Sequence, residues 1–150
     1  MKCFVAIVVL VCVFVVQDAS STCVGMAFKG DNGKYLSRAG DNKIQVIKNE
    51  PDTYTKFLAS EIDGKLVLKA DNGKYLQPVI SDTDGVVYIE AAKDTPDWYT
   101  QFIVHKQTDG TVALQAANGK YMCRVGDKSY YEAVKDGIDM SCLLKPQFQV

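Results

Sequence analysis

The sequence predicts an all-β fold built from three similar units. One turn is written three times, as GDNGKYL at 30–36, ADNGKYL at 70–76 and AANGKYM at 116–122. A second string occurs twice, as PDTYTKF at 51–57 and PDWYTQF at 96–102. No segment keeps an apolar period of 3.6 residues over the length of a helix. Short strands joined by repeated turns account for these three observations.

The N-terminus is typical of a secretory leader. Lys2 is followed by an unbroken apolar run from Cys3 to Val16, and Ala19 and Ser21 are small residues suited to cleavage. The run is shorter than the roughly 20 residues of a membrane span, although an uncleaved anchor is the alternative. We therefore expect a signal peptide over 1–21 and a secreted domain over 22–150 without stable membrane insertion.

Length and charge narrow the classes of function. A chain of 150 residues is long enough for one domain with a substantial core. Lys and Arg number 17 against 18 Asp and Glu, so the formal net charge is −1. Proteins that follow phosphate backbones need a basic excess. No nucleic-acid partner is expected.

The cysteines predict a disulfide. Of the five in the chain, Cys3 and Cys12 lie in the leader. In an oxidising compartment Cys123 and Cys142 are the favoured pair, which leaves Cys23 free or able to link two chains. Zinc is the weaker reading, because the chain has no CxxC spacing and its one histidine is distant in sequence. No metal and no cofactor are expected.

Each unit is predicted to contain four short strands. Alternating apolar residues such as Leu66 and Leu68 precede the repeated turn, and Asn-Gly indicates a hairpin because both residues accept a positive φ. Clusters such as AGDN, DTDG and VGDK mark further turns. The expected strands are 26–30, 34–38, 43–47 and 55–60; 65–69, 74–78, 86–90 and 101–105; and 111–115, 120–125, 129–134 and 147–150.

The spacing of the repeats predicts a β-trefoil. Phe57 and Phe102 end the second repeated string, and Phe148 in LLKPQF follows at a near-equal interval. The units are then about 26–64, 65–110 and 111–150. Twelve short strands in three units fit a six-stranded barrel closed by three hairpins, because closure removes exposed sheet edges. A three-bladed propeller or a β-solenoid fits these repeats less well.

The repeated strings resemble two groups of β-trefoil proteins. KADNGKYL is similar to the repeats of fascin-type trefoils. NGKYL together with PDxYTxF, DGTVALQAANGKYMCR and a later Cys is similar to the agglutinin domain of amaranthin-like lectins, over nearly the whole chain after the leader. Those lectins bind galactose- or N-acetylgalactosamine-containing glycans, often as dimers. The resemblance implies glycans or glycoproteins as partners and a homodimer, although a single domain departs from the tandem-domain members.

Other functions fit less well, and one alternative stays open. Ricin-type lectins carry repeated Gln-x-Trp motifs, whereas this chain has one Trp. Secretion separates the chain from the cytosolic actin bundling of fascin. No enzyme is expected, because His105 has no GxSxG nucleophile motif to serve and Asp82 and Asp84 lack the other ligands of a calcium loop. The alternative is a secreted non-enzymatic module, such as a protease inhibitor, a toxin-like protein or a structural trefoil.

Internal symmetry separates scaffold from candidate site. Residues that every unit keeps are expected to serve the fold, and these are Tyr35, Tyr75 and Tyr121 in the core or its rim and Lys34, Lys74 and Lys120 as exposed turn residues. Residues found in one unit are free for function. They include the pair Tyr130 and Tyr131, of which one should point inward, and Trp98.

Trp98 is the residue on which the predicted ligand site is centred. It replaces Thr53 in an otherwise matching string, and the third unit offers no aromatic residue there. A sugar presents an apolar C–H face and a hydroxyl edge, so Trp98 would be the plate and Asp97 a hydroxyl acceptor. Tyr99 is a weaker member, because Tyr54 is its counterpart. The alternative is that Trp98 caps the barrel and is buried.

Overall fold

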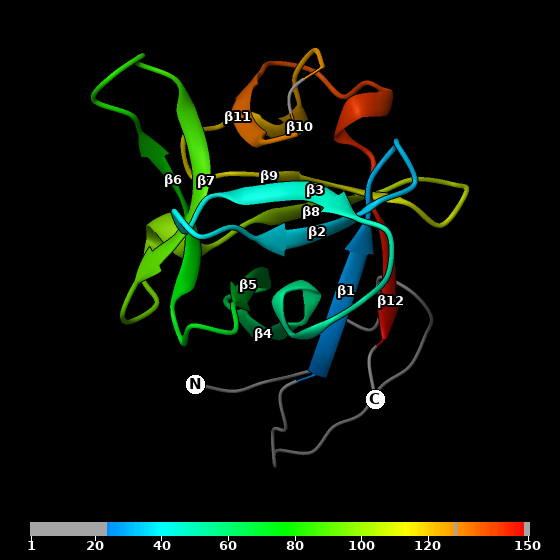
Figure 1. The fold of residues 1–150 in the computed structure, drawn as a ribbon, viewed down its shortest axis with the longest axis horizontal. Helices are drawn as coiled ribbons and strands as arrows, with labels where there is room; N and C mark the ends of the chain where they lie inside the picture. The colour runs from blue at the N-terminus through cyan, green and yellow to red at the C-terminus, as the bar shows by residue number, and fades with distance from the viewer. Residues whose placement is uncertain (1–23, 128, 149–150) are drawn as a thin grey trace.

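The computed structural model describes residues 24–127 and 129–148, and these form a β-trefoil (Figure 1). The expected signal peptide and Cys23 lie outside the described residues. Twelve strands and three short 3-10 turns occur in the part of the chain that is described, and the all-β expectation is confirmed.

The strands follow the chain in three groups of four, each with one 3-10 turn before its last strand. The first group is β1 (Val24–Lys29), β2 (Tyr35–Arg38), β3 (Ile44–Lys48), η1 (Thr53–Thr55) and β4 (Phe57–Ile62). The second is β5 (Lys65–Lys69), β6 (Tyr75–Ile80), β7 (Val87–Lys93), η2 (Trp98–Thr100) and β8 (Ile103–Lys106). The third is β9 (Val112–Gln115), β10 (Tyr121–Arg124), β11 (Tyr131–Lys135), η3 (Met140–Cys142) and β12 (Lys145–Phe148).

Six of the strands close into a barrel. Antiparallel pairing joins β1 to β4, β4 to β5 and β8 to β9, and β12 returns to β1. Single bridges complete the ring, from Leu66 on β5 to Phe102 and from Val112 on β9 to Leu144. β1 and β12 therefore lie side by side although they stand at opposite ends of the chain (Figure 1). The ring leaves no barrel strand with an open edge.

Three hairpins cover one end of the barrel. They pair β2 with β3, β6 with β7 and β10 with β11. Each hairpin touches the other two through one bridge, and these bridges are Lys43 with Glu90, Gln45 with Tyr130 and Tyr88 with Glu132. Corresponding residues of the three units thus meet around one axis, as pseudo-threefold symmetry requires.

The repeated Asn-Gly turn differs from the expected geometry. Only its glycine has a positive φ, for example +78° at Gly33, so the asparagine needs no left-handed backbone. The asparagine acts through its side chain instead. Oδ1 of Asn32 accepts from the Lys34 amide at 3.0 Å, and Nδ2 donates to the Val46 carbonyl on β3 at 3.2 Å. Asn72 and Asn118 make the same two contacts, so the turn is repeated because it anchors the hairpin of every unit.

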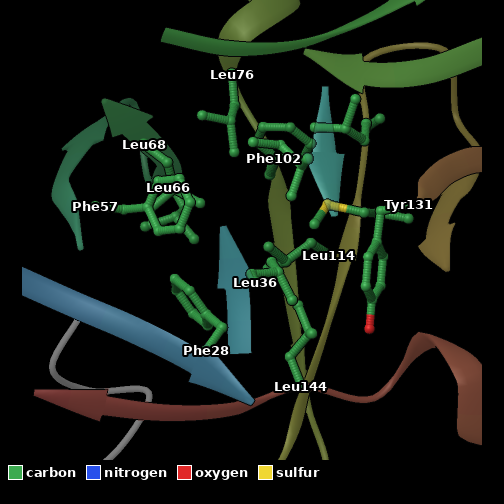
Figure 2. Close-up of a cluster of buried hydrophobic side chains, with 14 of the residues drawn as sticks. Phe28, Leu36, Phe57, Leu66, Leu68, Leu76, Phe102, Leu114, Tyr131 and Leu144 are labelled. Atoms are coloured by element: carbon green, nitrogen blue, oxygen red, sulfur yellow. The ribbon is translucent and has the colours of Figure 1, made fainter. Parts of the chain in front are cut away.

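Phe148 is not the counterpart of Phe57 and Phe102 that the sequence spacing suggested. Phe57 pairs with Met26 and Phe102 with Leu66, and the corresponding pair in the third unit is Leu144 with Val112. Leu144 is fully buried and lies among the core side chains in Figure 2. Phe148 is 44% exposed and lies on β12 beyond that position. The even spacing of phenylalanines was therefore coincidental in the third unit.

Tyr131 gives the core an asymmetric member. It is fully buried, whereas its neighbour Tyr130 is partly exposed, so one residue of the pair points inward as expected. Its counterparts are Ile44 and Ile89, because the three residues face equivalent positions on the second strand of their units, namely Arg124, Arg38 and Pro78. Among the described residues, no hydrogen-bond partner reaches the Tyr131 hydroxyl. Burial raises the pKa of that hydroxyl.

Candidate functional site

The site is built on η2, one of three loops with the same construction. Each loop begins with an aspartate whose side chain accepts from the backbone amide two residues later, and these aspartates are Asp52, Asp97 and Asp139. A lysine four residues earlier pairs with each aspartate at 2.6–2.7 Å. The cap fixes the first amides of a turn that is too short to stabilise itself.

Both carboxylate oxygens of Asp97 have partners within this loop construction. Its Oδ1 accepts from the Tyr99 amide at 2.9 Å, and its Oδ2 pairs with Lys93 at 2.7 Å. The hydrogen bond from Lys93 lowers the pKa of Asp97. Because Asp52 and Asp139 do the same work in the other units, the structure gives Asp97 the role of positioning the loop that carries Trp98.

Trp98 is exposed at the tip of η2. Its relative exposure is 59%, and its ring stacks on that of Tyr99 with centroids 3.9 Å apart and planes at 30°. The alternative in which Trp98 is buried therefore does not hold. In η1 the ring of Tyr54 instead faces two cations, Arg38 at 5.5 Å and Lys48 at 5.3 Å. Tyr99 supports an indole where Tyr54 holds charged side chains.

Trp98 borders a cavity of about 180 Å³ at the boundary between the second and third units. Apolar surface comes from Trp98, Ile103, Ala116 and Ala117, and polar groups come from Lys65, Gln101 and Gln115. No Asp or Glu is among the lining residues. We call this space the Trp98 cavity. It combines an exposed aromatic face with donors and acceptors for hydrogen bonds.

Three neighbouring strands bring the cavity residues together. The antiparallel bridge of Leu66 with Phe102 sets Lys65, at the start of β5, beside the start of β8. Ile103 on β8 pairs with Gln115 on β9. The Gln115 amide is held on both sides, because Nε2 donates to the Gly119 carbonyl at 2.9 Å and Oε1 lies 2.9 Å from Nε2 of His105. The wall is therefore largely preformed.

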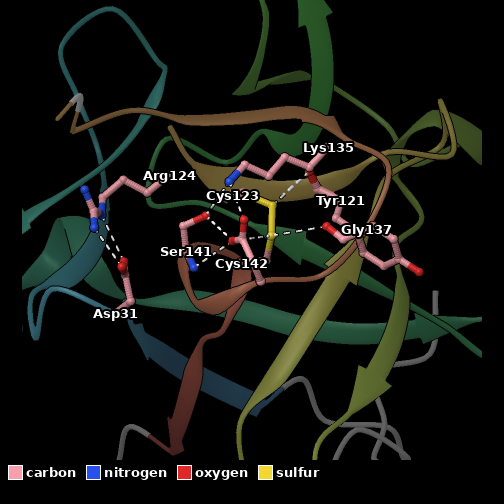
Figure 3. Close-up of a disulfide and its surroundings, with 9 residues drawn as sticks. Asp31, Tyr121, Cys123, Arg124, Lys135, Gly137, Ser141 and Cys142 are labelled. Atoms are coloured by element: carbon pink, nitrogen blue, oxygen red, sulfur yellow. Dashed lines mark hydrogen bonds and ion pairs between the residues drawn. A yellow bond between two sulfur atoms is a disulfide. The ribbon is translucent and has the colours of Figure 1, made fainter. Parts of the chain in front are cut away.

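The other two unit boundaries are closed by ion pairs that this boundary lacks. Arg38 makes two contacts with Asp71, at 2.7 and 2.9 Å. Arg124 makes the equivalent contacts with Asp31, at 2.9 and 2.7 Å (Figure 3). At the corresponding positions of the second and third units the sequence has Pro78 and Ala117. Both members of the pair are absent together, beside the one loop that carries a tryptophan.

A disulfide joins Cys123 on β10 to Cys142 in η3, which is the pair that the sequence favoured (Figure 3). Cys142 is fully buried. The bond ties the third loop to its own hairpin, and neither cysteine lines the Trp98 cavity. It therefore belongs to the scaffold.

The shared lysines and tyrosines lie where symmetry predicted. Tyr35 and Tyr75 are buried and Tyr121 is partly buried, so they belong to the core and its rim. The turn lysines each reach an acceptor after the third strand of their unit, namely Lys34 to Asn49, Lys74 to Asp94 and Lys120 to Asp136. These lysines are engaged within their own units.

A second aromatic cluster lies near the symmetry axis. The rings of Tyr88 and Tyr130 meet edge to face at 5.6 Å, and the Lys43 ammonium lies 4.9 Å from the first ring and 6.0 Å from the second. A hydrogen bond to Asp84 raises the pKa of Tyr88 to about 12. The cation is supplied by the protein itself, so this cluster stabilises the contact of the three hairpins.

The described topology defines a β-trefoil protein, and the comparisons agree with that class. A model of the Fascin domain family matches residues 9–82. The designed 3-fold symmetric protein ThreeFoil superimposes with a TM-score of 0.70 at 14% identity, covering 81% of this chain and 96% of that chain. The comparison with curated proteins finds no match.

A second solved structure is similar over one part of its length. The GlcNAcα1-4Gal-releasing endo-β-galactosidase from Clostridium perfringens matches with a TM-score of 0.68 at 17% identity. The match covers 85% of this chain but 33% of the enzyme, so this chain corresponds to about a third of that protein. Among the described residues, no helix is long and apolar enough to cross a membrane.

Proposed function

We propose that this protein is a secreted, non-enzymatic carbohydrate-binding protein and that it holds a sugar in the Trp98 cavity. The observation that carries the proposal is the 59% exposure of Trp98 on the rim of that cavity. The indole, stacked on a second ring, presents apolar surface to water. A ligand that covered this surface would lower the free energy through the hydrophobic effect. Neither Thr53 nor Met140, the counterparts of Trp98, offers an aromatic face.

The chemistry of the cavity suits a sugar ring. The indole face and Ile103 would cover the apolar C–H face, while Gln101 and Gln115 offer amide groups to hydroxyls. A volume of about 180 Å³ lies below the roughly 300–1,000 Å³ of cavities that enclose drug-sized ligands. One monosaccharide, the terminal residue of a glycan, is the size of ligand that fits.

Galactose- and N-acetylgalactosamine-containing glycans are the first ligands to test. The resemblance to amaranthin-like lectins suggests them. Asp97 enters this proposal as the residue that caps the loop, and Tyr99 as the ring on which Trp98 rests. Direct contact with the sugar is assigned to Trp98 and the two glutamines.

A glycan array followed by calorimetric titration tests the proposal. Trp98→Ala should abolish binding to the best array ligand while leaving the melting temperature unchanged, because the side chain is exposed. Met140→Ala is the matched control, since Met140 is 72% exposed at the equivalent loop tip and should leave binding intact. An array without ligands, or binding that survives Trp98→Ala, would contradict the proposal.

Secretion and a homodimer form part of the same proposal. The disulfide of Cys123 with Cys142 supports an oxidising compartment. N-terminal sequencing of protein collected from the medium of expressing cells should begin near Thr22. Sedimentation with and without a reductant would show whether a dimer exists and whether Cys23 links it.

A further inference from the structure

Three residues that line the Trp98 cavity each differ from both of their counterparts in the other units. Trp98 stands where those units have Thr53 and Met140. Lys65 comes directly before Leu66, which pairs with Phe102, and the equivalent positions in the other units hold Gly25 and Thr111. Ala117 follows in the repeated turn, where the others have Asp31 and Asp71. The fold does not require any of the three, because two other units form without them.

The changes at Lys65 and Ala117 favour an anion, whereas Gln101 and Gln115 stand where the first boundary has Lys56 and Lys69. Lys65 adds an ammonium group, and Ala117 removes a carboxylate. The cavity at the first boundary occupies the equivalent place, and its lining includes the acidic Asp71 as well as Lys56 and Lys69. The formal charge of the two linings is therefore the same, and the difference is that the Trp98 cavity contains no acid.

Lys65 also has no partner for its ammonium group within the described part of the chain. Three lysines pair with the aspartates that cap the η loops, and two more pair with Asp94 and Asp136. Across residues 24–127 and 129–148, no ion pair or hydrogen bond engages the Lys65 ammonium. A lysine beside an aromatic face, with no acid near it in the cavity wall, is available to a ligand.

We infer that the Trp98 cavity selects an anionic sugar, one that carries a carboxylate or a sulfate group. This inference rests on the proposed function. The ring lies on Trp98, and the anionic group is directed toward the Lys65 ammonium. A charge-assisted hydrogen bond of this kind is stronger than one between neutral groups, and the half-enclosed site screens it less than open water does.

Position 117 acts as the selectivity element. An aspartate there would place a carboxylate in the cavity wall, where it would neutralise Lys65 and repel an acidic ligand. The cavity at the first boundary shows this state, because Asp71 lines it while bound to Arg38. Pro78 stands where the other two units have Arg38 and Arg124, the partners of the aspartates. The arginine and the aspartate are therefore absent together, and neither charge is left unpaired.

Calorimetric titration with three related ligands tests the inference. The ligands are lactose, a sialylated lactose and a sulfated lactose, so that carboxylate and sulfate are separate arms. The unaltered protein should bind at least one acidic ligand about tenfold more tightly than lactose at low salt. The difference should shrink with added salt, because screening weakens charge pairs. In the unaltered protein, fluorescence of Trp98, the one tryptophan of the chain, gives a second readout.

Variants assign the effect to named residues. Lys65→Gln should remove the preference for the acidic ligand, so that the acidic ligand and lactose bind with similar affinity. Ala117→Asp should remove the preference as well, whereas Ala117→Asn has nearly the same shape without charge and should keep it. Melting temperatures of all variants, compared with that of the unaltered protein, establish that each is folded.

The outcomes separate this inference from the proposed function. Equal binding of neutral and acidic ligands, lost in Trp98→Ala, would overturn the inference and leave the proposed function standing. A preference that persists in Lys65→Gln would overturn it too. Inorganic sulfate that binds as tightly as the sulfated sugar would show an anion site without sugar recognition. Failure of every sugar to bind would overturn both.

Discussion

Cys142 occupies in η3 the position that Thr100 occupies in η2, and each residue fastens its loop by a different bond. The Thr100 hydroxyl accepts from the amide of Asp97 at 3.0 Å, which completes a capping box. Thr55 makes the same contact in η1. Cys142 cannot accept in this way, and the third loop is held by its disulfide to Cys123 instead. The equivalent loop position is therefore fastened by a threonine cap in η1 and η2 and by a disulfide in η3.

Removing the disulfide should destabilise the fold, and threonine should recover part of the loss. The bridge spans 19 positions, and a loop of this length stabilises by about 3 kcal/mol in the chain-entropy model. Cys123→Ser with Cys142→Ala should lose about that amount. Cys123→Ser with Cys142→Thr should recover about 0.5–2 kcal/mol, the usual worth of a cap. Urea unfolding of both pairs measures the difference, and equal midpoints would show that the capping box cannot form in η3.

Gly30→Ala should destabilise the protein because it overpacks the core. A Cβ at Gly30 would lie 2.8 Å from the Tyr131 hydroxyl and 2.9 Å from Val46 Cγ2. Overpacking of this kind costs about 1–3 kcal/mol. Tyr131→Phe alone should be neutral or stabilising, since it removes a buried hydroxyl without a partner among the described residues. In the double variant the cost of Gly30→Ala should be smaller. Additive unfolding energies would argue against the contact.

Gly73→Val should destabilise the second hairpin through the backbone. Gly73 has a φ of +80°, and an added Cβ would meet nothing within 4 Å, so packing does not enter. A β-branched residue resists this conformation at a cost of about 1–2 kcal/mol. Gly73→Asn is the control, because asparagine tolerates positive φ better. Thermal unfolding should rank the unaltered protein, the Asn variant and the Val variant in that order, and an unchanged melting temperature for Val would refute the turn geometry.

Acid should weaken the third loop between about pH 4 and pH 2. Hydrogen bonds from Lys135 and then Ser141 lower the pKa of Asp139 to about 2, below the value near 3.9 of an unfolded chain. The carboxylate therefore stabilises the fold above pH 4, and this contribution is lost as the pH falls toward 2. Its half-exposed position and added salt reduce the effect.

Asp139→Asn isolates that contribution. The amide keeps a capping oxygen but loses the charge, so the variant should be less stable than the unaltered protein at pH 7 and similar to it at pH 2. Asp82→Asn, in an exposed turn, is the control. Urea midpoints at both values measure the convergence. A gap that stays constant between the two pH values would rule out the ion pair as its cause.

The sequence was sufficient for the fold because the repeats are local. The turn sequences and the alternating strand sequences each have a local conformational preference. Because three similar units carry them, the β-trefoil topology can be predicted from the sequence. The third unit was harder. Only Asp139 survives from the PDxYTxF string, so the phenylalanine rhythm suggested Phe148, whereas packing against Val112 selects Leu144. Contacts between strands distant in sequence decide such a position.

Part of the candidate site could be predicted by the same internal comparison. That comparison marks Trp98 as present in one unit alone, and it also shows Asp97 to be shared, since Asp52 precedes Thr53 in the first unit. Lys65 and Ala117 were missed because their significance depends on lining one cavity with Trp98. The absence of an ion pair at Pro78 and Ala117 could not be predicted either. The equivalent pairs, Arg38 with Asp71 and Arg124 with Asp31, each join two different units, and the sequence alone does not show that these residues meet.

The pseudo-threefold frame also sets the valency that this protein can reach. Three boundaries share one backbone plan, but the residues proposed to recognise a ligand stand at one of them. Substitution of tryptophan at Thr53, lysine at Gly25 and alanine at Asp71 would place the same three residues at the first boundary, at a fixed angle to the Trp98 cavity. Several sites on one inflexible scaffold engage a branched glycan or a crowded surface by avidity, with no linker to order. With the proposed recognition residues at one boundary, the chain would bind one sugar at a time.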